Sequence, residues 1–447
     1  LHVILYHENL RVCTLMGNEI FTDNAKFTPY WWDEAPRPEI GSEGIPNAVD
    51  VVIIGAGFSG LSAALTIARG GRGVAVLEAD RPGEGASSRN GGAVGATLRF
   101  SFAKLTKMHG LKTALRFYSE TREARSWLYD FIESEGIECD LHRVGRFIGC
   151  HRPKDYDLLG RDLELQEKYL GTEGEMVSKA EQQRFIGSDI YHGGRFLRED
   201  ANLHPGKLHQ GLLAKVMAEG VPVLGRSKVN AIRRENGGFV LQVGFRSVRT
   251  RQLVVATNGY TGKETPWLHR RLLPMQSQII ATEHLAPDIM GQLVPENRQL
   301  GDTSRLHCYF RASPGHDRIL FGSRAGAAEI NDRRKSGRLL YRRLIEIFPQ
   351  LSEVKITHSW GGFIAYTFDH MLHLARNDDI FYVAGFCGSG VVNANYLGHK
   401  TGLKVLGKPN SQTVFDSEHP TLPFYTGKPW FLAPIVALKY WQDKLGL

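Results

Sequence analysis

Cysteine is scarce in this sequence. The 447 residues include five cysteines, an odd number, scattered without the CxxC or CxxH spacing of metal-binding motifs. This pattern argues against a disulfide framework and against a zinc site, and we expect no metal. A reducing compartment, the cytoplasm, is the simplest expectation.

Long apolar runs are also missing. No stretch of the sequence reaches the roughly 18 residues that a membrane-spanning helix needs. The first residues are apolar but lack the basic-then-apolar order of a signal peptide. Met16 is a candidate natural start, and we treat residues 1–29 as an arm that carries little information.

A concentrated basic surface is not evident either. The net charge is +8, but lysine and arginine are mostly dispersed among acidic residues. The densest basic cluster, at residues 333–343, has leucines interleaved at helical spacing. This favours a solvated helix face over a site for a polyanion, and we expect no nucleic-acid partner.

The chain does contain a βαβ pattern near its start. Residues 50–54 form an apolar run typical of a buried strand, residues 58–69 have one apolar helical face, and residues 73–77 form a second apolar run. Two parallel strands joined by a helix need such a crossover. The pattern therefore predicts a Rossmann-type unit.

The remaining pattern indicates two intertwined domains, because a chain of this length exceeds one compact core. Helices are expected at residues 103–135, 155–185 and 205–219. Strands are expected at residues 144–150, 221–224, 229–232, 239–243, 252–256, 275–281, 306–311, 318–322 and 380–384. The βαβ-like pieces lie at the start, near residues 200–260 and at the end, with antiparallel-looking strands between them.

The predicted fold class is therefore α/β, or α+β overall: a Rossmann-type nucleotide-binding domain with an inserted, mainly antiparallel substrate sheet. The expected divisions are an arm at residues 1–29, a nucleotide-binding domain at 30–105, 195–262 and 356–425, a substrate domain at 106–194 and 263–355, and a helical tail at 426–447.

The strongest chemical motif is the glycine turn between the first strand and helix. Gly55 allows the tight turn, Gly57 lets a pyrophosphate approach the backbone, and Gly60 lets helix and strand pack closely. The helix N-terminus offers N–H groups to the phosphates. Glu78, at the end of the second strand, is where an acid should hold the ribose hydroxyls. Together these features predict dinucleotide binding.

A second segment, residues 85–92, reads Gly-Ala-Ser-Ser-Arg-Asn-Gly-Gly. Its small residues and two hydroxyls are compatible with another edge of a long cofactor. They are equally compatible with a flexible surface loop, and the residues alone leave both interpretations open.

With these motifs in place, the sequence resembles the D-amino-acid-oxidase (DAO) superfamily and, within it, the gamma-glutamylputrescine oxidoreductase branch. The resemblance starts with residues 52–92 and extends over nearly the whole chain from about Tyr30. Supporting stretches are Tyr-Trp-Trp at 30–32, His-Pro-Gly-Lys-Leu at 204–208, Ala-Thr-Asn-Gly-Tyr-Thr at 256–261, Trp-Gly-Gly at 360–362 and Ala-Gly-Phe-Cys-Gly-Ser-Gly-Val at 384–391.

The resemblance implies FAD as the cofactor. Residues 89–92 would run beside the flavin, Val229 would meet the adenine, and residues 256–259 and 385–391 would approach the flavin ring. Glycines at 385, 388 and 390 would permit that close approach. The residues assigned to the cofactor are Gly55, Gly57, Phe58, Ser59, Gly60, Glu78, Ala79, Ala86, Ser87, Arg89, Asn90, Gly91, Gly92, Val229, Ala256, Thr257, Gly259, Gly385, Cys387, Gly388, Ser389, Gly390 and Val391.

The sequence departs from its relatives near the flavin. Cys387 and Ser389 stand where branch members often have serine and histidine. No cysteine precedes the Tyr366-Thr367 pair, where some relatives attach FAD covalently, so we expect non-covalent FAD. Leu320 stands where the oxygen-activating lysine of those relatives is expected. The electron acceptor is therefore oxygen or a quinone-type molecule, and oxygen is expected to react poorly.

The implied chemistry is hydride transfer from the carbon beside an amine nitrogen to the flavin, followed by hydrolysis of the imine. The amine must be neutral, which for an alkylamine at pH 7 costs about 4 kcal/mol, and an apolar site provides this by desolvation. Tyr309 and Arg311 alternate on one predicted strand and share a face. Arg311 is expected to clamp a substrate carboxylate, or else to form a surface ion pair. Tyr366 is expected to line the pocket, or else to be a core aromatic.

The expected function is thus FAD-dependent oxidation of a C–N bond in a small amine or amino acid, such as a gamma-glutamylated amine, an opine or an N-alkyl amino acid. The alternatives are a D-amino-acid dehydrogenase that passes electrons to a quinone and a non-catalytic flavoprotein subunit. The aromatic tail at residues 429–447 is expected to pack as a closing helix, with membrane docking as the less favoured alternative.

Overall fold

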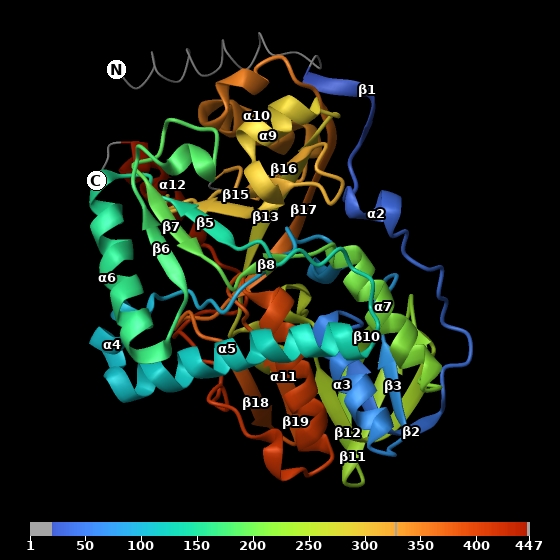
Figure 1. Cartoon of the computed structure of the whole chain (residues 1–447). Coiled ribbons are helices and arrows are strands. Elements are labelled where there is room, and N and C mark those ends of the chain that lie inside the picture. The colour runs from blue at the N-terminus through green and yellow to red at the C-terminus, as the bar shows by residue number, and fades with distance from the viewer. Residues whose placement is uncertain (1–19, 327–328, 445–447) are drawn as a thin grey trace.

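The computed structural model describes residues 20–326 and 329–444 of the chain. Within these residues, the strands form a nine-stranded sheet, an eight-stranded sheet and a small two-stranded sheet. The nine-stranded sheet occupies the upper half of the molecule in Figure 1, and the eight-stranded sheet the lower half. The predicted mixed α/β class, with one Rossmann-type sheet and one mainly antiparallel sheet, is confirmed.

The eight-stranded sheet contains the predicted βαβ unit. Its strands are β2 (Ala48–Ile54), β3 (Val74–Leu77), β9 (Val223–Leu224), β10 (Val229–Glu235), β11 (Gly238–Val243), β12 (Arg246–Val255), β18 (His373–Asn377) and β19 (Ile380–Ala384). β9, β3, β2, β12 and β19 pair in parallel, whereas β10 and β11 form an antiparallel extension of β12. The parallel strands are buried and apolar, as expected for strands covered on both faces.

The helices α3 (Phe58–Arg69) and α11 (Gly390–Val405) pack on this sheet, with α7 (Pro205–Ala218) against α3 and α5 (Leu111–Ser134) against α11. The helices α3 and α11 lie side by side at very short range (Figure 1). A side chain at Gly398 of α11 would place its Cβ 2.4 Å from the Ser59 carbonyl oxygen of α3. The glycine therefore permits the contact that joins the start of the chain to its end.

The nine-stranded sheet is mainly antiparallel. Its strands, in spatial order, are β1 (Phe21–Lys26), β17 (Ile356–Tyr366), β13 (Leu273–Thr282), β16 (Ile319–Ser323), β15 (Tyr309–Ala312), β14 (Gln299–Asp302), β5 (Arg146–Gly149), β7 (Gly194–Leu197) and β6 (Gly174–Val177). α10 (Arg333–Ile347) packs against its central strands. Leu340 and Leu344 of α10 are buried, which confirms that the basic cluster lies on an amphipathic helix.

The remaining elements are short or peripheral: α2 (Trp31–Glu34), α4 (Phe102–His109), α6 (Pro153–Leu170), α8 (Pro266–His269), α9 (Pro287–Leu293), α12 (Leu432–Lys444), and the two-stranded pair β4 (Ala93–Val94) and β8 (Ala201–Asn202). No helix in the described part of the chain is both long enough and apolar enough to cross a membrane. The same residues contain no group of three histidines, cysteines or acids that could hold a metal ion.

One sequence-based helix is wrong over half its length. The helical pattern predicted for residues 155–185 ends at Leu170, because Gly171 adopts a left-handed conformation with φ of 61° and terminates α6. Residues 174–177 then form β6, at the edge of the nine-stranded sheet. The prediction missed this glycine as a helix stop.

Sheet membership also differs from the expected domain ranges, which stay a proposal. β17 and β7 fall in ranges assigned to the nucleotide-binding domain but pair within the nine-stranded sheet. The helix α5 falls in a range assigned to the substrate domain but packs against α11. These pairings are made with strands and helices distant in sequence, so a local pattern does not report them.

Candidate functional site

The glycine turn between β2 and α3 is closely packed. Gly55 has φ of +104°, and a Cβ on it would lie 2.9 Å from the Ala256 carbonyl oxygen. A Cβ on Gly60 would lie 1.9 Å from the Gly55 carbonyl oxygen. The N-cap residue of α3 is Gly57, which has no side chain that could cap the helix. The turn thus presents a helix N-terminus whose dipole and N–H groups suit a phosphate.

The Glu78 carboxylate lies against this turn. Its Oε2 accepts a hydrogen bond from the Ala56 amide at 2.8 Å, and its Oε1 accepts one from the Asp80 amide at 3.2 Å. Burial raises the pKa of this carboxyl. The acid therefore lies at the carboxyl end of β3 and beside the phosphate-binding turn, the arrangement that ribose recognition requires.

The segment at residues 85–92 packs on the glycine turn. The Phe58 amide, in the first turn of α3, donates to the Ser87 hydroxyl at 2.9 Å. A Cβ on Gly57 would lie 2.9 Å from the same oxygen. Ser88 is buried. Of the two interpretations left open by the sequence, these contacts favour an edge of the cofactor site over a flexible surface loop.

Three indole N–H groups hold this segment in place. Trp31 donates to the Asn90 carbonyl at 2.8 Å, Trp32 donates to the Ser88 hydroxyl at 2.8 Å, and Trp360 donates to the Arg89 carbonyl at 2.9 Å. Apart from the Trp31-Trp32 pair, no sequence pattern predicts these bonds. The donors come from α2 and β17, which lie far from the segment along the chain.

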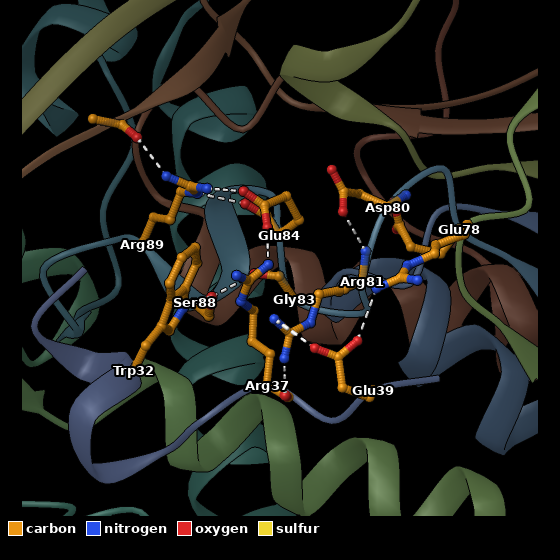
Figure 2. Close-up of polar contacts among 12 residues, drawn as sticks. Trp32, Arg37, Glu39, Glu78, Asp80, Arg81, Gly83, Glu84, Ser88 and Arg89 are labelled. Carbon is orange, nitrogen blue, oxygen red and sulfur yellow. Dashed lines mark hydrogen bonds and ion pairs between the residues drawn. The ribbon is translucent and has the colours of Figure 1, made fainter. Parts of the chain in front are cut away.

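The Arg89 side chain belongs to an ion network that Figure 2 shows. Arg89 and Arg37 both pair with the Glu84 carboxylate. The Trp32 ring lies under both guanidinium groups, 3.5 Å from that of Arg37 and 4.6 Å from that of Arg89. Beside them, Arg81 pairs with Glu39 at 3.0 Å. The Arg89 charge is therefore already paired within the protein, and its contact with the cofactor stays a prediction.

The polar side chain of Asn90 shapes the rest of the segment. Its Nδ2 donates to the Ala86 and Ser87 carbonyls, each at 3.0 Å, and its Oδ1 accepts from the Gly92 amide at 2.8 Å. Gly92 has φ of +72°, and a Cβ there would lie 2.0 Å from the Leu203 carbonyl oxygen. Both residues thus fix the backbone of the turn.

Ala256 and Val229, also assigned to the cofactor, lie at strand ends of the eight-stranded sheet, directly after β12 and at the start of β10. The Ala256 amide donates to the Ile54 carbonyl at 2.9 Å, directly beside the glycine turn. The Ser227 amide, two residues before Val229, donates to the Glu78 carbonyl at 2.7 Å. The arrangement places Val229 on the ribose side of the site, which is compatible with the expected adenine contact.

The glycines of the segment at residues 385–391 differ in their surroundings: Gly385 is tightly packed, whereas Gly388 borders an open space. Gly385 has φ of +83°, and a Cβ there would lie 2.4 Å from the Thr367 methyl group, so packing within the protein already requires this glycine. Gly388 has φ of +100° and no atom within 4 Å of where its Cβ would lie. The space at Gly388 is compatible with the predicted approach of the flavin ring, which stays a prediction.

One asparagine that the site prediction omitted joins two of these segments. Asn258 adopts a left-handed conformation, with φ of 44°, and its Oδ1 accepts from the Gly385 amide at 3.0 Å. Thr257 bonds Thr261 through their hydroxyls at 2.7 Å. The positive φ could not be read from the sequence, although asparagine tolerates it better than most residues.

Cys387 is held as a buried thiol. Its Sγ lies 3.1 Å from the Gly385 carbonyl oxygen and 3.8 Å from the Thr367 hydroxyl, and the side chain is 9% exposed. Burial raises its pKa to about 11. A protonated, enclosed thiol is a poor nucleophile. This supports the expectation that Cys387 does not bind the flavin covalently.

Tyr309 and Arg311 share one side of β15, as predicted. A Cβ on Gly91 would lie 3.2 Å from the Tyr309 ring, and one on Gly92 would lie 3.0 Å from an Arg311 guanidinium nitrogen. The Tyr309 hydroxyl bonds the Ser277 hydroxyl at 2.9 Å. Both side chains therefore support the segment at residues 85–92 from beneath.

Arg311 is more enclosed than a substrate clamp needs to be. Its side chain is 1% exposed and donates to the Leu203 and Ala312 carbonyls, each at 2.8 Å. Its Nη2 has no hydrogen-bond partner within the described residues, and burial lowers its pKa to about 9. These contacts favour a role in positioning the Gly92 turn, and the carboxylate clamp stays a prediction.

Tyr366 is the last residue of β17 and lies close to the segment at residues 385–391. The Cys387 amide donates to the Ala365 carbonyl at 3.0 Å, which joins the two segments. The Tyr366 ring packs edge-to-face on His370, with centroids 5.8 Å apart. Burial raises the pKa of Tyr366 and lowers that of His370. Tyr366 is thus an uncharged aromatic side chain at this position, and its role in lining the pocket stays a prediction.

The fit of FAD to the site rests on these donors and spaces. A helix N-terminus whose N-cap residue is glycine, a carboxylate beside it and open space at Gly388 suit, respectively, the pyrophosphate, the ribose and the flat ring of one extended dinucleotide. The residues present fit the cofactor.

Comparison with known proteins agrees with this geometry. The family model DAO, described as FAD dependent oxidoreductase, matches residues 50–402. The chain is 30% identical to the gamma-glutamylputrescine oxidoreductase of Escherichia coli K12, over 89% of this chain and 93% of that protein. It is 29% identical to a probable oxidoreductase OrdL of Haemophilus influenzae, over 82% and 85%. The solved glycine oxidase of Geobacillus kaustophilus superposes with a TM-score of 0.70 at 20% identity, covering 83% of this chain and 97% of that one.

Proposed function

The chain belongs to the DAO family of FAD-dependent oxidoreductases, and from that premise we propose that it oxidises a carbon–nitrogen bond of a small amine or amino acid to an imine, which water hydrolyses. FAD, when bound, supplies the hydride acceptor that this oxidation requires. The glycine turn, Glu78 and the segment at residues 85–92 would hold its dinucleotide part.

The observation that carries the proposal is the uncharged aromatic wall beside Gly388. Burial raises the pKa of Tyr366 and of Tyr309, the latter to about 12, and lowers that of His370. None of these groups is charged at pH 7, and none would hold an amine in its protonated form. The wall therefore favours the neutral amine, whose lone pair assists departure of the hydride.

Cations near this wall also favour the neutral form of the amine. The positive charges of Arg99 and Arg324 both lie close enough to Tyr366 to lower its pKa, against the larger effect of burial. A like charge lowers the pKa of an alkylammonium ion as it does that of any cationic acid. The site thus promotes loss of the amine proton without a dedicated base.

Under this proposal the substrates are amines that also carry a carboxylate. A gamma-glutamylated amine, an opine or an N-alkyl amino acid each carries at least one carboxylate, which suits a site with cations at its wall. The similarity to a gamma-glutamylputrescine oxidoreductase, at 30% identity, supports the gamma-glutamylated amine. The opine and the N-alkyl amino acid stay alternatives.

The electron acceptor is proposed to be a quinone-type molecule in preference to oxygen. Leu320 is 2% exposed and packs in an apolar cluster with Trp31 and Trp360. No cation is therefore supplied at this position to stabilise the charge that develops when oxygen is reduced. Turnover with a dye acceptor, but only slow turnover with oxygen, is the expected result.

Anaerobic mixing of the FAD-loaded protein with a panel of amines tests the proposal. At least one carboxylated amine should bleach the visible flavin absorbance, whereas NADH should not be required. If dithionite reduces the flavin but no amine does, the protein is a non-catalytic flavoprotein and the proposal fails. If only D-amino acids bleach it, the D-amino-acid dehydrogenase alternative replaces it.

A further inference from the structure

Three cations from distant parts of the chain converge on the aromatic wall of the active site. Lys104 of α4 holds its ammonium 4.1 Å from the centre of the Phe100 ring. The Phe100 ring packs edge-to-face on His370, with centroids 5.5 Å apart, and His370 packs in the same way on Tyr366 at 5.8 Å. This row of three rings leads from exposed Lys104 to the Gly388 side of the site.

Arg99 and Lys439 lie along the same row. Arg99 precedes Phe100, is exposed, and influences the pKa of Tyr366, Cys387 and His370 alike. Lys439, half-buried on α12, influences that of His370. Arg99 adjoins Phe100 in the sequence, and the charges of both cations act on His370 in this row.

Among the described residues, no acid forms an ion pair with Arg99, Lys104 or Lys439. Burial and then the positive charges of Arg99, Arg305 and Lys104 lower the pKa of Lys439, and no acid offsets them. Within residues 20–326 and 329–444, the side chains of Arg99 and Lys439 form no hydrogen bond or ion pair. The nearest acid acting on His370 is Asp369, which already accepts from the His373 ring at 3.0 Å and from the Met371 amide at 3.1 Å.

A second observation points into the same space. The His370 Nδ1 atom is buried without a hydrogen-bond partner within the described residues. His370 itself adopts a strained left-handed conformation, with φ of 58°. Gathering like charges around an unsatisfied polar atom is unfavourable unless an anion joins them.

We propose that Arg99, Lys104 and Lys439 form an anion-binding entrance to the active site, which selects amine substrates that carry a carboxylate several bonds away from the oxidised carbon–nitrogen bond. This inference rests on the proposed amine oxidation and narrows its substrate class. The aromatic row binds the apolar stem between the two ends of the substrate, and the cations bind the distal carboxylate. The helix α12 thereby contributes to specificity as well as to packing.

Binding of a matched pair of probes tests the entrance without turnover. Glutarate is a dianion, and glutaramide is its neutral analogue of the same length. Both are titrated into the oxidised, FAD-loaded protein, and the dissociation constants come from perturbation of the visible flavin spectrum. Glutarate should bind at least about tenfold more tightly than glutaramide, and its affinity should fall as salt is added.

Variants identify the cations responsible. Arg99→Gln and Lys439→Gln should each weaken glutarate at least about fivefold and leave glutaramide unchanged. Arg233→Gln, which removes an exposed arginine from the edge strand β10, is the matched control and should change neither constant. Equal binding of the two probes to the parent protein, or equal glutarate binding by Arg99→Gln, Lys439→Gln and Arg233→Gln, overturns the inference.

Kinetics link the entrance to substrate choice. For acid–amide pairs of amines that reduce the flavin, the acid should have the lower KM in the parent protein, and Arg99→Gln should raise that KM with little change in kcat. An unchanged preference for the acid in this variant contradicts the inference. Because the titration needs no turnover, failure of the anion site and failure of amine oxidation are separate results.

Discussion

Removal of the Glu78 carboxylate is the perturbation that most directly tests how the cofactor is held. The carboxylate receives two backbone hydrogen bonds, from the Ala56 amide at 2.8 Å and the Asp80 amide at 3.2 Å, and it faces the site expected for the ribose. Glu78→Ala removes acceptors for the ribose hydroxyls and also loosens the glycine turn.

The expected loss can be worked from the bonds involved. Hydrogen bonds to a charged group contribute about 1.5–3 kcal/mol each, and a ribose offers two hydroxyls. Counting one such bond as lost in full, and the second as replaced by water, gives about 2–3 kcal/mol. This corresponds to a rise of about 30- to 150-fold in the dissociation constant of FAD.

Equilibrium titration of the apoprotein with FAD, followed by flavin fluorescence, measures this constant. Asp80→Ala is the matched control, because it removes an exposed carboxylate from the same loop without touching the glycine turn. Its affinity for FAD should stay within about threefold of the parent. If Glu78→Ala binds FAD as tightly as Asp80→Ala does, the assignment of Glu78 is refuted.

Three further predictions follow from buried groups. Acid precipitation should leave the yellow colour in the supernatant, for the parent and for Cys387→Ser, because the thiol is enclosed and protonated; colour in the pellet contradicts this. His204 is buried, and its pKa is lowered to about 3. Between pH 7 and pH 5 this histidine therefore takes up a proton in the unfolded state but not in the native state. The contribution of His204 should lower the free energy of unfolding by about 2 kcal/mol over this range. His204→Asn, which keeps an N-cap for α7, should remove that share of the pH dependence in urea unfolding, and an unchanged slope opposes the argument. Arg311→Met should lower thermal stability and FAD retention if its bonds to the Leu203 and Ala312 carbonyls dominate, whereas selective loss of carboxylated substrates would establish the clamp instead.

The parts of the site that local sequence predicts are those built from consecutive residues. Gly55, Gly57 and Gly60 predict the turn because each lies in the same strand–turn–helix unit, and the boundaries of α3 match the predicted helix. Glu78 follows from its place at the end of the next strand. These features needed no knowledge of long-range contacts.

The parts that local sequence does not predict are built from distant segments. The indole donors Trp31 and Trp360 reach one loop from two elements far apart in the chain. The pairing of β17 with β13 depends on register between strands and not on the composition of either. The charge of Arg99 acts on Lys439, although the loop before α4 and the helix α12 are far apart in the sequence. Charge convergence of this kind leaves no motif.

Single-turnover reduction of the bound flavin by a carboxylated amine, under anaerobic conditions, tests the central proposal most directly. Amine oxidation predicts that each flavin bleached yields one carbonyl product and one released amine or ammonia. Deuterium on the carbon beside the nitrogen should slow the bleaching, because that C–H bond breaks as hydride leaves. A flavin that dithionite reduces but that no amine bleaches, with no carbonyl formed, contradicts the proposal.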